Sequence, residues 1–314
     1  MAAGLAMNAG IAVGSAAFHA VQDAIEQRRE RREEKAELIE ALEAALVTSH
    51  TAAFPLTRAP EWVEPDLVDR AAVRREYRTR ATAPFKWWQW LKRHRAGREA
   101  VVEADRWADN EDRRLRDEAV AMYERACELW PGLQANDPET VLAALEDAFA
   151  DNMVPAFAVD CDEATASVAM VTGTSDELPS DEVVRDGRGS AQFRRRTNGD
   201  ELHRDSALSN MLATAKETLA VAPFIETVQV VGLERRGSLL RKRDRLVPIC
   251  LLRLTRGELS GVDWWSPLAT IVENCSLHYE LDDEGRALES LDLEDEPDVV
   301  AVVEEVAEAL DCRC

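Results

Sequence analysis

The chain of 314 residues lacks the short motifs that identify common enzyme classes. No GxGxxG follows an expected strand, and neither GxxxxGK(S/T) nor GxSxG occurs, so the usual dinucleotide-binding, P-loop and nucleophile-elbow signatures are missing. The five histidines show no HxxxH or HExxH spacing, and the expected core strands carry no E-x-K. Asp160 and Asp162 have an alternate, metal-like spacing that more often marks a strand edge or turn. We therefore predict no cofactor, metal or catalytic residue, with an unrecognised hydrolase as the last alternative.

Basic residues are scarce as well. The chain has 38 Lys and Arg against 60 Asp and Glu, a formal net charge of −22. So negative a surface repels phosphate backbones at long range, which disfavours nucleic acid as a partner unless a local basic patch binds it. The hydrophobic fraction of 46% is high enough for a core, and the length allows two domains or one domain with a helical extension.

The cysteines form no CxxC pair. The six are Cys127, Cys161, Cys250, Cys275, Cys312 and Cys314. Cys250 lies in an apolar segment, where a thiol packs as a small hydrophobe. The pattern is typical of reduced thiols in a cytoplasmic protein. Cys312 and Cys314 leave open a metal or redox tail, but two thiolates supply only half a metal site.

Residues 1–20 are apolar but small, and contain no Lys or Arg. A secretory signal would begin with basic residues, and the many Ala and Gly contribute little to membrane insertion. Gly10 and Gly14 form a GxxxG pair, which lets two helices approach closely. Three interpretations remain: a helix packed on protein, a membrane contact, or a loose tail.

The first 133 residues are predicted to form a helical arm. Its parts are the small apolar segment 1–20, long helices over 18–47 and 84–130, a proline-bearing connector over 48–65, and a shorter helix over 66–80. Both long helices show apolar residues at 3-4 spacing with a charged centre, net positive over 28–35 and net negative over 109–118. We predict that they pair antiparallel as a coiled-coil-like hairpin with a polar central layer.

One stretch of this arm differs from the rest of the acidic protein. Residues 66–98 carry ten Lys or Arg against three acids, and aromatic residues alternate with the cations. The predicted contact patch consists of Phe85, Lys86, Trp87, Trp88, Trp90, Lys92, Arg93 and Arg95. The rings could be the foot of the long helix, buried against the C-terminal domain. They could instead anchor the chain at a membrane interface, stack on nucleic acid, or contact a protein partner.

Residues 134–314 are predicted to form an α+β domain with a mixed or antiparallel sheet. Asp137 and Pro138 mark a helix start, as N-cap and first helical residue. The longest apolar runs then predict a helix from Ser206 and the strands IETVQVVGLER and LVPICLLRL. An acidic helix over 297–310 closes the chain.

The polar segment 175–205 is predicted to be a long surface loop, with a short extended piece at SAQFRRRT. Its basic cluster is Arg194, Arg195 and Arg196. A solvated loop and an anion site are the two interpretations.

The segment NDPETVLAALEDAFADN, with the later AFAVDCD and ATAKETLAVAP, resembles a family of uncharacterised actinobacterial proteins. The resemblance covers about the last 180 residues. It implies the C-terminal domain and its boundary, but no activity and no site residues.

The sequence thus favours a non-enzymatic interaction or assembly module whose helical arm associates with itself or with a protein partner. The first alternative is a peripheral membrane protein that uses residues 1–20 and the Trp-rich basic helix 84–95 together. A nucleic-acid-binding accessory protein comes third. We expect a cytoplasmic protein, placed at the inner face of the membrane under the first alternative.

Overall fold

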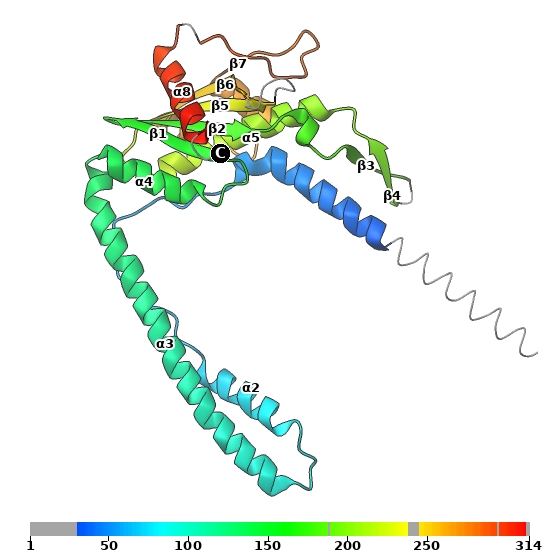
Figure 1. Ribbon diagram of the computed structural model, residues 1–314, viewed down its shortest axis with the longest axis vertical. Helices are drawn as coiled ribbons and strands as arrows, with labels where there is room; N and C mark the ends of the chain where they lie inside the picture. Colours follow the sequence, from blue (N-terminus) through cyan, green and yellow to red (C-terminus); the bar gives the residue numbers. More distant parts are fainter. Residues whose placement is uncertain (1–29, 188, 238–244, 294, 312–314) are drawn as a thin grey trace, which may run out of the picture. The chain divides into compact units, whose positions relative to one another are not determined.

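The computed structural model describes residues 30–187, 189–237, 245–293 and 295–311 (Figure 1). Contacts divide them into two compact units. Residues 58–135 form one unit, the helical hairpin, and the described parts of 30–57 and 136–311 form the other, the α+β unit. The arm predicted over 1–133 is therefore divided between the two units, and the interpretations of residues 1–20 lie outside the described residues.

The α+β unit is built on a mixed five-stranded sheet of order β1-β2-β5-β6-β7. The strands are β1 Ala156–Asp162, β2 Thr165–Thr172, β5 Thr227–Arg236, β6 Arg245–Thr255 and β7 Ser276–Tyr279. β2 pairs parallel with β5, and the other neighbours pair antiparallel. The predicted α+β class is confirmed.

Helices cover both faces of this sheet. On one face α8, Pro297–Asp311, packs its Val299, Val302 and Val306 on a cluster that includes Val231 and Leu251. On the other face α5, Gly199–Val221, contacts β2, β5 and β6. Because both faces are buried, β5 and β6 read in the sequence as continuous apolar runs rather than as alternations.

α5 is buried around most of its circumference, as expected of a central helix. Its outer side is covered by the 3-10 helix η1, Ser49–Thr51, which follows the helical residues 30–48. The fully buried Ser209 hydroxyl accepts a hydrogen bond from the His50 backbone N–H at 3.1 Å, and Lys216 Nζ donates to the carbonyls of His50 and Ala52 at 2.7 and 2.6 Å. These contacts fix residues 49–52 to the core.

Residues 175–196 are not one long loop, although the predicted extended piece SAQFRRRT is present as a strand. They contain the 3-10 helix η2, Ser175–Glu177, and an antiparallel hairpin of β3, Asp181–Arg185, and β4, Ala191–Arg195. This hairpin packs on helical residues 30–48: Arg185 pairs with Glu40 at 2.7 Å. The hairpin is stabilised by a distant helix, which local sequence signals do not reveal.

The remaining helices of the α+β unit are short. They are α4 Pro138–Phe149, α6 Arg256–Gly261 and α7 Leu268–Asn274. The predicted start of α4 is confirmed: Asp137 caps it by accepting from the Thr140 N–H at 3.0 Å. α5 begins at Gly199, seven residues before the predicted start at Ser206. Residues 199–205, the predicted end of the loop, form the first turns of the helix.

The helical hairpin consists of α2, Arg70–Thr82, and α3, Trp90–Gln134 (Figure 1). At 1.5 Å per residue the 45 residues of α3 extend about 68 Å. The partner of α3 in this unit is α2, whereas helical residues 30–48 contact the β3–β4 hairpin. The predicted pairing of 18–47 with 84–130 is therefore not found among the described residues. α3 also begins at Trp90 rather than Pro84, because residues 83–89 form a turn.

Among the residues placed by the structure, no helix combines the length and apolar character needed to cross a bilayer.

Candidate interaction surface at the end of the helical hairpin

The two helices of the hairpin meet through small side chains. The buried residues on the N-terminal two-thirds of α3 are Gly97, Ala100, Ala104, Ala108 and Asp112. α2 has no buried residue. An interface of this kind brings two backbones close together but removes little apolar surface from water, so it contributes little hydrophobic free energy.

Charged pairs fix the start of α2 against α3. The buried carboxylate of Asp112 accepts from the Val68 N–H at 3.0 Å and from Arg70 Nη2 at 2.6 Å. Arg70 also reaches Asp109 at 2.8 Å, and Arg74 reaches Asp105 at 2.6 Å. The Arg70 guanidinium, followed by the Val68 N–H, lowers the pKa of Asp112. The hairpin is therefore held in register by ion pairs beside a narrow apolar seam.

The predicted contact patch lies at the turn between α2 and α3, which is at the bottom of Figure 1. Short backbone bonds shape this turn: the Phe85 N–H donates to the Thr82 carbonyl at 3.2 Å, and the Gln89 N–H donates to the Lys86 carbonyl at 3.0 Å. The Gln89 side chain accepts from the Lys86 N–H at 3.2 Å. We call residues 83–95 the tip.

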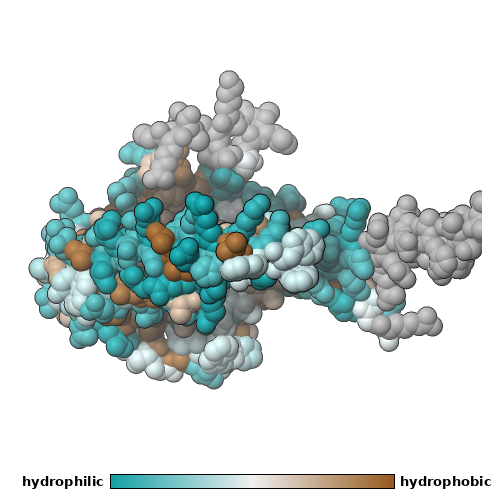
Figure 2. All heavy atoms as spheres, turned by 90° about the horizontal axis from the view of Figure 1, so that it is seen from below, coloured by the Kyte–Doolittle hydropathy of each residue, from teal (hydrophilic) through white to brown (hydrophobic). Residues whose placement is uncertain are grey.

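The tryptophans of the tip are exposed. Trp87, Trp88 and Trp90 have 79%, 56% and 64% of their surface accessible, and Leu91 has 65%. On the face drawn in Figure 2, brown and pale residues lie among hydrophilic ones. Within the hairpin unit the rings therefore lie at the surface, and their interpretation as a helix foot buried against the C-terminal domain stays a prediction.

All the charged side chains of the tip and its flanks are basic. Between Glu76 and Glu99 the chain has seven Lys or Arg and no acid. Lys86 Nζ lies 5.0 Å from the centroid of the Trp88 ring, and Trp87 meets Trp88 edge to face at 5.8 Å. Lys92 and Arg93 are exposed on the first turn of α3, while Arg95 pairs with Glu99 at 2.9 Å. The structure therefore brings all the predicted patch residues together at one end of the hairpin.

Exposed apolar surface is concentrated in this unit beyond the tip. The structure describes eighteen large apolar side chains that are exposed, and eleven belong to the hairpin, about a quarter of the chain. They are Trp62, Val63, Leu67, Trp87, Trp88, Trp90, Leu91, Val102, Trp107, Val120 and Met122. Sequence reasoning placed Met122 on the predicted apolar seam of the long helix and made no prediction for Trp107, so it found neither as a surface residue.

The other predicted basic site does not assemble. Arg194 and Arg195 are exposed on β4, but the Arg196 side chain is only 6% accessible. Arg196 pairs with Glu43 and donates to the carbonyls of Pro179 and Asp181. Its guanidinium thus fixes the β3–β4 hairpin, and the three arginines form no common anion site.

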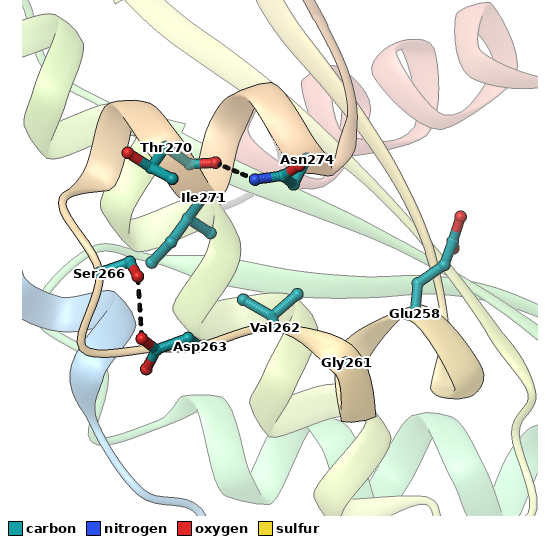
Figure 3. Close-up of a pocket in the computed structure, with 8 residues that line it drawn as sticks. All are labelled: Glu258, Gly261, Val262, Asp263, Ser266, Thr270, Ile271 and Asn274. Carbon is teal, nitrogen blue, oxygen red and sulfur yellow. Dashed lines mark hydrogen bonds between the residues drawn. The ribbon is translucent and has the colours of Figure 1, made fainter.

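The α+β unit carries two grooves among its described residues. One of about 400 Å³ lies between α6 and α7, with Val262 and Ile271 facing each other across it (Figure 3). Its Asp263 carboxylate accepts from Ser266 Oγ at 2.9 Å, and Glu258 is held in a capping box with Thr255. Bonds from Thr255 lower the pKa of Glu258. The eight lining residues include no histidine, lysine or cysteine, and the one hydroxyl bonded to a carboxylate among them is Ser266 on the exposed Asp263.

A second groove, of about 530 Å³, lies beside β7, where Arg253 and Glu296 form an ion pair at 2.5 Å. Ser209 Oγ lies 2.9 Å from His50 Nδ1, but the serine is completely buried and holds η1. Asp160 caps the Cys161 N–H at 2.8 Å beside a bulge in β1. In the described part of the chain no three His, Cys, Asp or Glu side chains gather as metal ligands do.

Comparisons with family models, curated proteins and solved structures find no match to this chain. The resemblance of its C-terminal region to uncharacterised actinobacterial proteins therefore stays a prediction.

Proposed function

We propose that the protein is a non-enzymatic interaction module and that residues 58–135 are its contact unit. The observation that carries this proposal is the concentration of exposed large apolar side chains on the hairpin, eleven of the eighteen in the described chain. Apolar and aromatic side chains left exposed as a group are typical of surfaces that bind a partner.

The arrangement of the hairpin supports the same proposal. Both of its junctions are anchored at the C-terminal end of α5: the Thr57 N–H donates to the Ala220 carbonyl at 2.8 Å, and Asn136 Nδ2 donates to the Phe224 carbonyl at 3.2 Å. The hairpin is thus an insertion between two segments that the α+β unit already holds. An insertion of this kind can be used for binding without disturbing the core that carries it.

Photo-crosslinking tests the proposal. A photoreactive amino acid is placed in the full-length chain at Trp107 or at Met122, and the control position is Met153 of the α+β unit, which is 64% exposed. We expect adducts from the hairpin positions and few from Met153, because the hairpin is the contact unit. Equal yields at all three positions, or no adduct from the hairpin, would contradict the proposal.

A further inference from the structure

The tip places three chemical groups in order along the hairpin axis. The rings of Trp87 and Trp90 lie at its end. Cations follow within the next two turns of α3, up to Arg98, and on the last turns of α2 at Arg78 and Arg80. The first acid of α3, Glu99, lies nine residues after Trp90, about 13 Å along the helix.

This order matches the layers of a lipid bilayer surface. Indole rings favour the depth of the headgroups, where an apolar body and a polar N–H are both accommodated. Lys and Arg just above them meet the phosphates of anionic lipids. Glu99, about 13 Å beyond Trp90 along the helix, is more than a Debye length of about 8 Å from the rings, so it repels the lipid surface weakly at physiological salt. The net charge of −22 is therefore compatible with local attraction at the tip.

We propose that the tip is an interfacial anchor for membranes that contain anionic phospholipid. The inference rests on the proposed function, because it adds a lipid surface at the end of the same contact unit, whose flanks at Trp107 and Met122 are where protein adducts are expected. Trp87, Trp90 and Leu91 enter the headgroup layer, and Lys92 and Arg93 pair with lipid phosphates. Only the tip of the hairpin contacts the membrane interface, and the hairpin does not cross the bilayer.

Two observations favour lipid over macromolecular partners of the tip. Base stacking needs open ring faces, and the Trp88 ring is already occupied: Lys86 lies over it, and Trp87 packs against it edge to face. Protein partners usually seat their anchors in pockets, and the tip is a projecting end, while both grooves described above belong to the α+β unit. A lipid interface takes up exposed aromatic side chains without a preformed pocket.

Vesicle flotation of the full-length chain tests the anchor. Vesicles of phosphatidylcholine with phosphatidylglycerol are compared with vesicles of phosphatidylcholine alone, at low and at high salt. We expect binding to the anionic vesicles that weakens with salt. Trp87→Ala/Trp90→Ala should weaken binding about tenfold or more. Its control is Trp265→Ala, which removes a ring that is 84% exposed in the α+β unit.

A charge variant keeps the test independent of the rings. Lys92→Gln/Arg93→Gln should weaken binding about 25-fold, since each cation near an anionic surface contributes about fivefold. Arg106→Gln/Arg113→Gln, on exposed positions of the same helix, should change it by less than about twofold. All variants should keep the thermal midpoint of the parent chain.

The outcomes separate this inference from the proposed function. Flotation that fails, or that falls equally in the control variants, overturns the anchor. Tip-dependent binding to a single-stranded oligonucleotide that displaces the vesicles also overturns it. If flotation fails while Trp107 still gives protein adducts, the contact unit stands and its partner is a protein. If both readouts fail, both proposals are wrong.

Discussion

In the α+β unit, β5 and β6 bury their large side chains on both faces of a sheet, between α5 on one side and α8 on the other. In the helical hairpin, α2 buries no residue, and the interior of α3 against it is made of Gly97 and three alanines beside Asp112. The same residue types that form the core of one unit are left on the surface of the other. The first unit thus buries its large apolar side chains, and the second leaves them exposed, as the proposed contact unit would.

The largest expected effect is in the core of the α+β unit. Leu252, at the centre of β6, has no accessible surface. Leu252→Ala should lower the free energy of unfolding by about 2–5 kcal/mol, because it removes buried methyl groups and leaves a cavity. Urea unfolding measures this. Leu91→Ala in the hairpin is the matched variant, and a loss as large there would break the comparison.

A second core variant tests backbone packing. The sheet places Gly232 on β5 opposite Cys250 on β6, and a Cβ at Gly232 would lie 2.3 Å from Cys250 Sγ. Gly232→Ala should therefore cost about 1–3 kcal/mol of overpacking. Gly261→Ala is the control, since a Cβ there meets no atom within 4 Å. Equal free energies of unfolding for the two variants would show that β5 and β6 can shift to accommodate a Cβ at Gly232 at little cost.

The hairpin should respond locally to its own charged contact. Asp112→Asn keeps the size of the side chain but removes the charge that pairs with Arg70. Amide exchange should become faster over 68–74 and stay unchanged in β5, because the two units have separate contacts. Asp109→Asn, on the exposed second partner of Arg70, should do less. Acceleration in β5 would mean that the units unfold together.

A pH effect is expected where η1 meets α5. Burial lowers the pKa of Lys216 from 10.5 to about 8. Between these values the unfolded chain binds more protons than the folded chain, so the free energy of unfolding rises with pH through this window. Lys216→Met should lose this rise. Urea unfolding at pH 8 and above compares the slopes, and parallel slopes for both proteins would contradict the shifted pKa.

The smallest effect on stability is expected at the tip. Trp87→Ala/Trp90→Ala should change the free energy of unfolding by no more than about 0.5 kcal/mol, because exposed side chains contribute little. A decrease of several kcal/mol in the free energy of unfolding, measured in urea, would show that the rings are buried against protein.

Sequence reasoning was sufficient where local signals and burial agree. The cap at Asp137 and the apolar runs of β5 and β6 predicted their elements, since a strand covered on both faces needs no partner to be recognised. It found β4 only as a short extended piece and missed β3 and the hairpin: Arg185 and Arg196 are satisfied by Glu40 and Glu43, about 150 residues away. Charged residues in short segments otherwise read as loop.

The candidate surface could be predicted in composition but not in burial. The alternation of Trp with Lys and Arg identified residues 85–95, since no other stretch of this acidic chain resembles it. Whether the rings are core or surface depends on what lies against the turn at 83–89, which the pattern does not contain. Spacing also placed Ala104 and Ala108 of α3 on an interacting face, but it assigned that face to residues 18–47 instead of α2.

Removal of the helical hairpin tests most directly whether the α+β unit supplies the stability and the hairpin supplies the contacts. Residues 58–135 are replaced by a short Gly-Ser linker, which joins two points that the α+β unit already holds, at Ala220 of α5 and at Phe224 just after it. Urea unfolding, sedimentation velocity and vesicle flotation are then compared with the full chain. We predict cooperative unfolding of the shortened chain and loss of the association that the full chain shows. A shortened chain that does not fold, or that associates as the full chain does, would contradict the account.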